Sequence, residues 1–250
     1  MSDALSIVHI TDIHIGETDA PRGKLYPRKN FLKVLQKVKE DPPDLIVIGG
    51  DLAADNGELD SYRWIKHHLD SLSIPYFVIT GNHDLAENMI AVFGLETGPV
   101  PGKLYYKKQI KGQTLIFMDS ASKEIDQNQL NQLVIDAGQT KEEITLFIHH
   151  PPTNCGCLFM DNTYPLLNSA SVFAVLESIP NLKLIVCGHY HTEKIVLKSG
   201  KTILITPSTL LQFSQTDPNF KIDFNVESKI VGWRTITSYQ NRQETRVHYL

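Results

Sequence analysis

Apolar runs typical of buried strands alternate with amphipathic stretches along the first three-quarters of the chain. Residues 5–11 are rich in β-branched side chains and alternate in polarity, which indicates a strand. Similar patterns occupy residues 44–50, 76–80, 144–148 and 184–187. Between them, helical spacing of apolar residues predicts helices from Pro27 to the Pro42-Pro43 pair and over residues 59–72, 85–93, 127–137 and 169–179. This alternation favours an α/β domain with parallel strands.

The remaining segments predict a loop and several antiparallel strands. Residues 104–109 and 114–118 flank Lys111-Gly112 as a hairpin, and a loop extends from the next strand to about residue 167. After residue 191 the helices stop, and an antiparallel meander is expected over residues 202–206, 230–237 and 245–249. No linker or fixed-period repeat interrupts the pattern, so residues 1–250 are expected to form a single domain.

Composition and charge exclude several classes of partner. The 250 residues are 42% hydrophobic, enough for a large core, and their net charge is −4 with no block of like charges. This balance offers no basic patch for nucleic acid or a membrane surface, and no apolar run reaches the ~20 residues of a membrane span. Three cysteines are too few for a disulfide framework, and the first residues lack the features of a secretory signal. A cytoplasmic location is therefore expected, while no pattern encodes the oligomeric state.

Potential metal ligands follow five of the predicted strands. They are Asp12 and His14, Asp51, Asn82 with His83, His149, and His189 with His191. Because the carboxyl ends of parallel strands meet at one edge of a sheet, these side chains are expected to lie close together. Extended backbone alternates its side chains, so Asp12 and His14 are expected to point the same way, as are His189 and His191.

Each of these residues also has a simpler explanation. Asp12 suits a turn, Asn82 suits a Gly-Asn turn, and His149 suits a packed position in the core. Together, however, they supply oxygen and imidazole ligands in the number that a pair of metal ions requires, without a thiolate. Such ligands suit manganese, iron, zinc or cobalt and do not select among them. The joint pattern favours a dinuclear metal site.

The order and spacing of these residues resemble those of a known family. The motifs Asp12-x-His14, Gly50-Asp51, Gly81-Asn82-His83-Asp84, His149 and Gly188-His189-x-His191 are similar, in the same order, to the five motifs of the calcineurin-like metallophosphoesterases. Residues 206–213 and Gly232-Trp233-Arg234 resemble the tail of bacterial class III 3′,5′-cyclic AMP phosphodiesterases. The resemblance implies a four-layer α/β/β/α sandwich, with parallel βα units first and antiparallel strands at the C-terminus.

The resemblance also implies which residues hold two metal ions. The implied ligands are Asp12, His14, Asp51 and His191 for the first ion, and Asp51, Asn82, His149 and His189 for the second. His149 is preferred to His150 because the family ligand is followed by one residue and then by proline. The expected ions are divalent or of mixed valence, with iron and manganese favoured and zinc or cobalt as alternatives.

The chemistry expected of such a site is hydrolysis of a phosphodiester. Two ions ~3.5–4 Å apart lower the pKa of a shared water, and the bridging hydroxide attacks phosphorus. Two divalent ions exceed the negative charge of Asp12, Asp51 and the hydroxide by about one, which a phosphodiester monoanion neutralises. The departing ribose oxygen needs a proton, and the expected general acid is His83, with Asp84 orienting its imidazole. The alternative is that His83 only braces the turn at Asn82.

Other polar and aromatic positions lie near the predicted site. Asp119-Ser120 is expected to be a solvated strand end, because no base for a serine nucleophile is identifiable. Asp161, Asn168 and Phe213 are candidates for contact with a nucleotide, although packing is the simpler role for Phe213.

The most specific function that follows is hydrolysis of 3′,5′-cyclic AMP to 5′-AMP, with a small-molecule cyclic nucleotide as the partner. A related esterase acting on 2′,3′-cyclic nucleotides, glycerophosphodiesters or phosphomonoesters would share the chemistry. A non-catalytic scaffold of the same fold is a further alternative. Such scaffolds lose ligands, whereas here every ligand position is filled.

Overall fold

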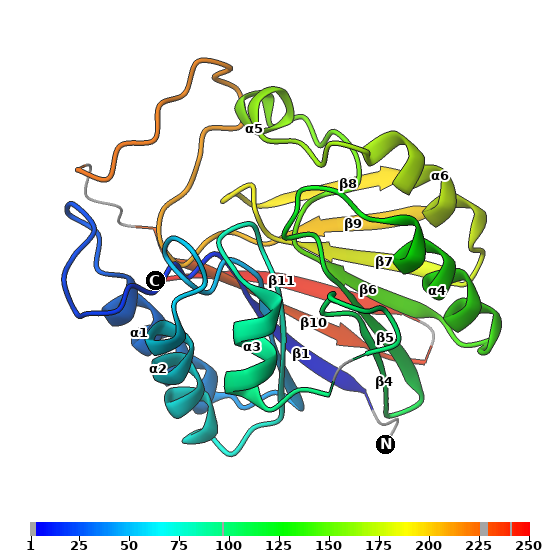
Figure 1. The fold of residues 1–250 in the computed structure, drawn as a ribbon, viewed down its shortest axis with the longest axis horizontal. Coiled ribbons are helices and arrows are strands. Elements are labelled where there is room, and N and C mark those ends of the chain that lie inside the picture. Colours follow the sequence, from blue (N-terminus) through cyan, green and yellow to red (C-terminus); the bar gives the residue numbers. More distant parts are fainter. Residues whose placement is uncertain (1–3, 97, 226–229, 241) are drawn as a thin grey trace.

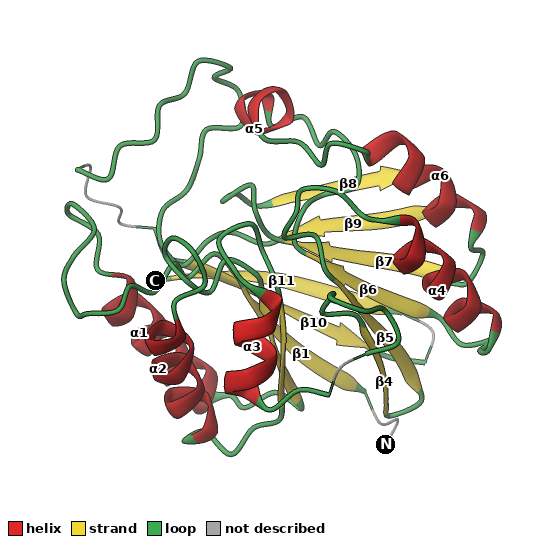
Figure 2. Cartoon of the chain, in the orientation of Figure 1, coloured by secondary structure: helices red, strands yellow, loops and turns green. Residues whose placement is uncertain are grey.

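Two mixed sheets pack face to face in the computed structural model, and helices cover the outer face of each sheet (Figures 1 and 2). The structure describes residues 4–96, 98–225, 230–240 and 242–250. In spatial order, the first sheet contains β11 (Gln243–Tyr249), β10 (Gly232–Ser238), β1 (Leu5–Ile10), β2 (Leu45–Gly49) and β3 (Tyr76–Ile79). The second contains β4 (Tyr106–Ile110), β5 (Gln113–Met118), β6 (Ile144–Ile148), β7 (Leu182–Cys187), β9 (Lys201–Ile205) and β8 (Lys194–Lys198).

The centre of each sheet is parallel. β1, β2 and β3 run in one direction in the first sheet, as do β5, β6, β7 and β9 in the second. The helices on the first sheet are α1 (Pro27–Glu40), α2 (Leu59–Asp70) and α3 (Ala86–Phe93). Those on the second are α4 (Gln127–Gly138) and α6 (Ser169–Ser178). The predicted four-layer arrangement with parallel βα units first is confirmed.

Amphipathic sequence explains how the helices attach to the sheets. Pro27 occupies the first turn of α1, where its missing N–H costs no hydrogen bond. Phe31, Val34, Leu35 and Val38 then form one buried stripe, which packs in the same core cluster as the outer face of the first sheet.

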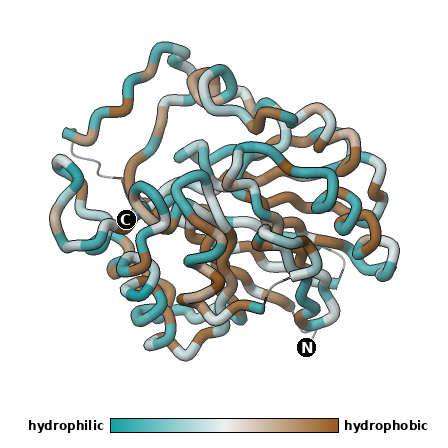
Figure 3. The backbone as a smooth tube through the Cα atoms, in the orientation of Figure 1, coloured by the Kyte–Doolittle hydropathy of each residue, from teal (hydrophilic) through white to brown (hydrophobic). Residues whose placement is uncertain are grey.

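Apolar side chains from both sheets fill the space between them. Phe117 of β5 and Phe147 of β6 stack with ring centroids 5.2 Å apart, in one cluster with Ile7 of β1 and Val47 of β2. Figure 3 shows hydrophobic segments along the strands and hydrophilic segments on the outer loops. Burial of each such side chain contributes ~1.5–3 kcal/mol to the free energy of folding. The packed sheets therefore hold the loops at their ends in fixed positions.

The C-terminal strands do not form the predicted meander. β9 pairs in parallel with β7 and antiparallel with β8 in the second sheet, whereas β10 and β11 pair in the first. The chain crosses between the sheets from Ile205 to Gly232, so the three predicted strands never share one antiparallel unit. Local sequence patterns locate strands, but pairing depends on contacts that are distant along the chain.

Two elements are additional to those predicted. The edge strand β8 precedes β9, and the short helix α5 (Leu158–Thr163) lies within the segment expected to be a loop. Of the helices in the described part of the chain, none has the length and apolar character that a membrane crossing requires.

Candidate metal centre

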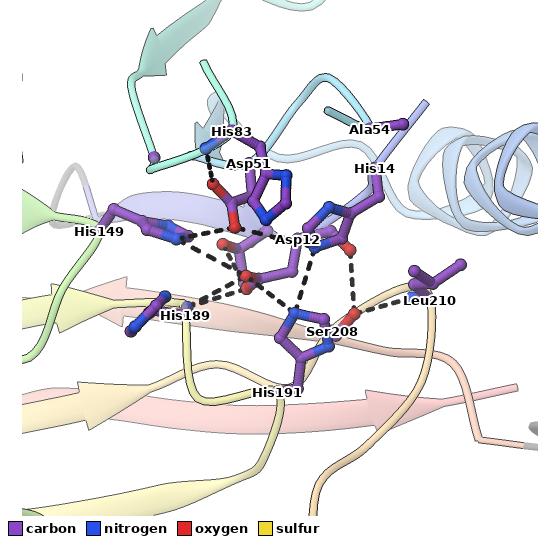
Figure 4. Close-up of polar contacts among 12 residues, drawn as sticks. Asp12, His14, Asp51, Ala54, His83, His149, His189, His191, Ser208 and Leu210 are labelled. Carbon is purple, nitrogen blue, oxygen red and sulfur yellow. Dashed lines mark hydrogen bonds and ion pairs between the residues drawn. The ribbon is translucent and has the colours of Figure 1, made fainter. Parts of the chain in front are cut away.

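The loops that follow β1, β2, β3, β6 and β7 gather at one edge of the sandwich. They bring seven candidate ligands and one further histidine together: Asp12, His14, Asp51, Asn82, His83, His149, His189 and His191. Figure 4 shows the Asp12 carboxylate, which follows β1 of the first sheet, in contact with His149, His189 and His191, which follow strands of the second sheet. The sequence-based expectation that these side chains lie close together therefore agrees with the structure.

The backbone conformation at the candidate ligands differs from the extended conformation that was predicted. β1 ends at Ile10 and β7 ends at Cys187, before the candidate ligands begin. Asp12, His14, Asp51, His189 and His191 all have positive φ, between 46° and 66°. Left-handed backbone costs ~1–2 kcal/mol per residue, so the surrounding structure must hold these turns in place. The prediction that side chains alternate along extended backbone is therefore wrong at the pair Asp12 and His14 and at the pair His189 and His191.

Two glycines allow the loops to approach one another. A Cβ atom on Gly50, which has φ +93°, would overlap the imidazole of His149. A Cβ atom on Gly81 would overlap the carboxylate of Asp51. Each glycine therefore brings main chain from one sheet edge against a candidate ligand.

The candidate ligands form one group of Asp12, His14 and His191 and a second of Asp51, His149 and His189, and a further group of His14, Asp51 and His83 links the two. In the first group, His191 Nε2 lies 3.2 Å from Asp12 Oδ1 and 3.2 Å from His14 Nε2, and His14 Nε2 lies 3.8 Å from Asp51 Oδ2. In the second, His149 Nε2 lies 3.3 Å from Asp51 Oδ2, and His189 offers a ring nitrogen within 4.8 Å of both. Asp51, whose carboxylate lies near members of both groups, is the residue expected to bridge two ions.

Three imidazoles are oriented by main-chain carbonyl groups. His191 Nδ1 donates to Leu211 O at 2.9 Å, His149 Nδ1 donates to Gly49 O at 2.7 Å, and His189 Nε2 donates to Tyr164 O at 2.9 Å. In each ring the second nitrogen is left for the centre of the site. This is the arrangement by which proteins fix the tautomer of a metal-binding histidine.

At four of the candidate ligands the charge matches the ionisation that metal ligands require. Burial opposes ionisation of Asp12 and Asp51, but the neighbouring histidines lower the pKa of both carboxyl groups. Burial lowers the pKa of His14 to about 3 and that of His189 to about 4, which keeps both rings neutral. At His149 burial is outweighed by the charges of Asp51 and Asp12, which raise the pKa to about 9. Ionised carboxylates and neutral imidazoles are the forms that bind cations.

Some buried polar atoms at the centre have no hydrogen-bond partner. Asn82 Oδ1 and His149 Nε2 are excluded from solvent, and neither atom forms a hydrogen bond with the described residues. A buried polar atom without a partner costs free energy, and a bound cation would remove that cost by accepting their lone pairs. The residues present therefore fit a metal ion.

His149 meets both candidate carboxylates, and its neighbour His150 does not. His149 Nε2 lies 3.7 Å from Asp12 Oδ1 in addition to its contact with Asp51. His150 instead pairs its Nδ1 with the hydroxyl of Ser120 at 2.8 Å. The geometry agrees with the choice of His149 over His150.

The main chain of His83 braces the site, and its imidazole lies close to His14 and Asp51. Its N–H donates to Asp51 Oδ1 at 2.9 Å, and its ring packs edge-on against that of His14. The imidazole forms no hydrogen bond with the described residues, and it lines the cavity in front of the candidate ligands. Bracing by the main chain leaves the ring available for chemistry.

Asp84 does not orient the imidazole of His83, so that expectation is wrong. Its carboxylate accepts hydrogen bonds from the N–H groups of Leu52, Ala53 and Gly81 and from the hydroxyl of Tyr62. Burial, together with the charge of Asp51, raises the pKa of Asp84 to about 6. Asp84 therefore ties the loop after β2 to the loop after β3.

A cavity of about 300 Å³ opens in front of the candidate ligands. Its lining includes the apolar and aromatic side chains of Met160, Tyr164, Leu210, Leu211, Phe213, Ile222 and Phe224. Arg22 and Lys123 also line the cavity and add two cations. Phe213 stacks on the ring of His191, with centroids 4.2 Å apart and planes 1° apart, so it packs against a candidate ligand.

The other polar positions of the sequence analysis have structural roles. Asp119 and Ser120 are buried, so the expected solvated strand end is wrong. The carboxylate of Asp161 accepts three main-chain N–H groups from residues 155–157 and the hydroxyl of Tyr190. Asn168 bonds to both the N–H and the carbonyl of Ile125. These contacts account for the side chains of Asp161 and Asn168 without a nucleotide.

Two groups that position the site were missed. The carbonyl of Tyr164, just after α5, orients His189, and the hydroxyl of Ser208 donates to the carbonyl of Asp12 at 2.9 Å. The Tyr164 carbonyl has no sequence signal, because a main-chain acceptor carries no residue identity. Ser208 lies within residues 206–213, whose resemblance to a family tail did not indicate this role.

Comparison with known proteins gives consistent matches. A family model described as calcineurin-like phosphoesterase matches residues 5–193. A probable cyclic nucleotide phosphodiesterase of Fibrobacter succinogenes is 39% identical over 245 residues, covering 98% of this chain and 94% of that protein. The 3′,5′-cyclic adenosine monophosphate phosphodiesterase CpdA of Escherichia coli K12 is 28% identical over 256 residues. The match covers 98% of this chain and 89% of that protein. A dimetal phosphatase from Danio rerio has a TM-score of 0.74 at 13% identity, covering 97% of this chain and 95% of that chain, and therefore shares the fold.

Proposed function

The chain belongs to the calcineurin-like phosphoesterase family and is a metal-dependent hydrolase of phosphoesters, and we propose that its substrate is a 3′,5′-cyclic nucleotide, with cyclic AMP converted to 5′-AMP. The observation that carries this proposal is the position of the ligand groups beside a small cavity whose lining includes several apolar side chains. A nucleotide needs both features, because its phosphate is anionic and its base is flat and largely apolar. The names of the relatives support the same substrate class.

We propose that the site holds two metal ions through the residues named above. Asp12, His14, Asp51 and His191 would hold one, and Asp51, Asn82, His149 and His189 would hold the other. Iron and manganese are the ions that the family resemblance favours, with zinc or cobalt as alternatives, since oxygen and imidazole ligands suit all four. When bound, such ions supply an activated water and stabilise negative charge on the phosphoryl oxygens.

The residues of the chain contribute orientation and proton transfer. Tyr164, Gly49 and Leu211 fix the three imidazole rings through their carbonyl groups, so each ligand is held before substrate enters. His83 projects an unpaired imidazole into the cavity, where it would donate a proton to the departing ribose oxygen.

A substrate panel tests the proposed function. The Mn²⁺-loaded protein is incubated with one substrate per reaction, and the products are separated by chromatography. The substrates are 3′,5′-cyclic AMP, 2′,3′-cyclic AMP, a glycerophosphodiester and 4-nitrophenyl phosphate. The expected result is 5′-AMP from 3′,5′-cyclic AMP as the fastest reaction. Rapid turnover of another ester without turnover of 3′,5′-cyclic AMP would refute the proposed substrate.

The role of His83 has its own test. His83→Ala is expected to lower kcat by roughly 10²–10⁴-fold and to leave the metal content unchanged, because the main-chain N–H to Asp51 remains. His67→Ala, on the exposed face of α2, is the matched control. Loss of metal in His83→Ala would instead assign the ring a structural role.

A further inference from the structure

Lys123 is an exposed cation of the cavity. Its side chain lines the cavity together with Asn82 and His83. Among the described residues, its ammonium group has no hydrogen bond, ion pair or aromatic contact. The other cation of the cavity, Arg22, is engaged, since it donates to Ala54 O at 3.0 Å and lies 4.5 Å from the ring centroid of Phe224.

The backbone of Lys123 is in a conformation that lysine rarely adopts. Its φ is 63°, in the same region as the candidate ligands and as the turn residues Ser73, Lys111 and Ser199. The strained conformation is held on both sides of the residue. The N–H of Lys123 donates to Ser120 O at 2.9 Å, and its carbonyl accepts from the N–H of Leu167, also at 2.9 Å. A strained turn that the fold enforces is a common feature of functional sites.

The loop that carries Lys123, residues 119–126, is fixed to the rest of the site. Asp119 accepts from the N–H of Leu104 at 3.0 Å, and Asn168 bonds to both main-chain groups of Ile125. Ser120 is hydrogen-bonded to the ring of His150, which immediately follows a candidate ligand. The loop therefore has a fixed position relative to the metal centre, and it carries the lysine at the cavity.

We propose that Lys123 binds substrate, with its ammonium group donating to a non-bridging oxygen of the phosphoryl group. This inference rests on the proposed function, in which the substrate is a phosphodiester. In a cyclic nucleotide the phosphate is the single anionic group, so it is the natural partner for an unpaired ammonium in the cavity. Lysine acts here as a compact charge on a flexible stem, carried by a loop of fixed position.

Steady-state kinetics of Lys123→Gln and Lys123→Arg test the proposal, with the Mn²⁺-loaded protein and two substrates. Bis(4-nitrophenyl) phosphate contains a phosphodiester but no nucleobase, whereas 3′,5′-cyclic AMP contains a phosphodiester and a nucleobase. Lys123→Gln is expected to raise KM for both substrates about tenfold and to change kcat less than about threefold, whereas Lys123→Arg retains most of the affinity. Lys141→Gln, at an exposed position outside the cavity, is the matched control.

The two substrates separate the possible failures. An unchanged KM for both substrates in Lys123→Gln overturns the proposal, and so does a rise for cyclic AMP alone, which would place the lysine at the base or ribose. If the wild type hydrolyses only bis(4-nitrophenyl) phosphate, the proposed nucleotide substrate is refuted. The role of Lys123 in binding the phosphoryl group is then still tested by the KM for that ester. If the wild type hydrolyses neither, calorimetric binding of inorganic phosphate to the Mn²⁺-loaded protein decides. Binding about tenfold weaker in Lys123→Gln supports the proposal, and equal binding refutes it.

Discussion

The hydroxyl of Ser208 provides a quantitative test of how the loop after β9 holds the metal centre. It donates to the carbonyl of Asp12 at 2.9 Å and accepts from the N–H of Leu210 at 2.8 Å, and the side chain is fully buried. Ser208→Ala removes both hydrogen bonds and leaves two main-chain groups without a partner in a dry environment. Each bond contributes ~1 kcal/mol net, and an unsatisfied buried group costs ~1–3 kcal/mol, so a loss of about 2–3 kcal/mol in the free energy of unfolding is expected.

The adjacent residue supplies a matched control with the opposite expectation. Thr209 Oγ1 is buried and has no hydrogen-bond partner among the described residues. Thr209→Val keeps the shape of the side chain and removes only this unsatisfied hydroxyl, while the main-chain N–H of residue 209 still bonds to Thr11 O. The free energy of unfolding is therefore expected to stay constant or to rise by up to ~1 kcal/mol.

Thermal unfolding of the metal-free proteins, followed by circular dichroism in EDTA, measures both effects. For a chain of this length, ~1 kcal/mol corresponds to about 2–4 °C, so Ser208→Ala is expected to melt about 4–12 °C below the wild type. Repeating the measurement with Mn²⁺ is expected to show a smaller metal-dependent stabilisation in Ser208→Ala, because the turn at Asp12 is less firmly held. A melting temperature within about 1 °C of the wild type, or an equal loss in Thr209→Val, would refute this account of the loop.

Two further predictions concern the ligand choice and the dependence of stability on pH. His149→Gln is expected to lose at least one metal ion per chain and His150→Gln to keep both, as measured by elemental analysis; the reverse result would make His150 the ligand. Partial burial of Asp44 is outweighed by hydrogen bonds from Lys111 and Ser6, which lower its pKa below the usual 3.8. Because the pKa is lower in the folded state, ionised Asp44 stabilises the fold above about pH 4 and this contribution is lost as the pH falls through the folded-state value. Asp44→Asn is thus expected to cost less than ~1 kcal/mol at pH 7 in urea titrations, and this cost is expected to shrink as the pH falls below about 4. A cost that does not shrink on acidification would contradict the assignment.

Much of the fold was predictable because its central strands have strong local patterns. The apolar runs that form β1, β2, β3, β6 and β7 are bounded by glycine, proline or polar residues, and they deliver the candidate ligands at their ends. Parallel strands place those ends at one edge, so residues as distant as Asp12 and His191 were expected to meet. The close approach of His191 Nε2 to Asp12 Oδ1, 3.2 Å, agrees with that expectation.

The remaining features depend on contacts that a local pattern does not contain. α5 has only six residues, and Asp161 holds it through bonds to residues 155–157 and to Tyr190. Asp119 was expected to be solvated, but Leu104 and Gln129 provide buried partners from elsewhere in the chain. The left-handed turns at the candidate ligands are likewise imposed by the assembled site. Isolated sequence windows cannot indicate such partners.

The central claim is that two ion sites share the carboxylate of Asp51. Elemental analysis of the purified protein, after saturation with Mn²⁺ and removal of unbound ion, tests it most directly. The account predicts two ions per chain in the wild type and one or none in Asp51→Asn. One ion or none in the wild type, or two in Asp51→Asn, would contradict it.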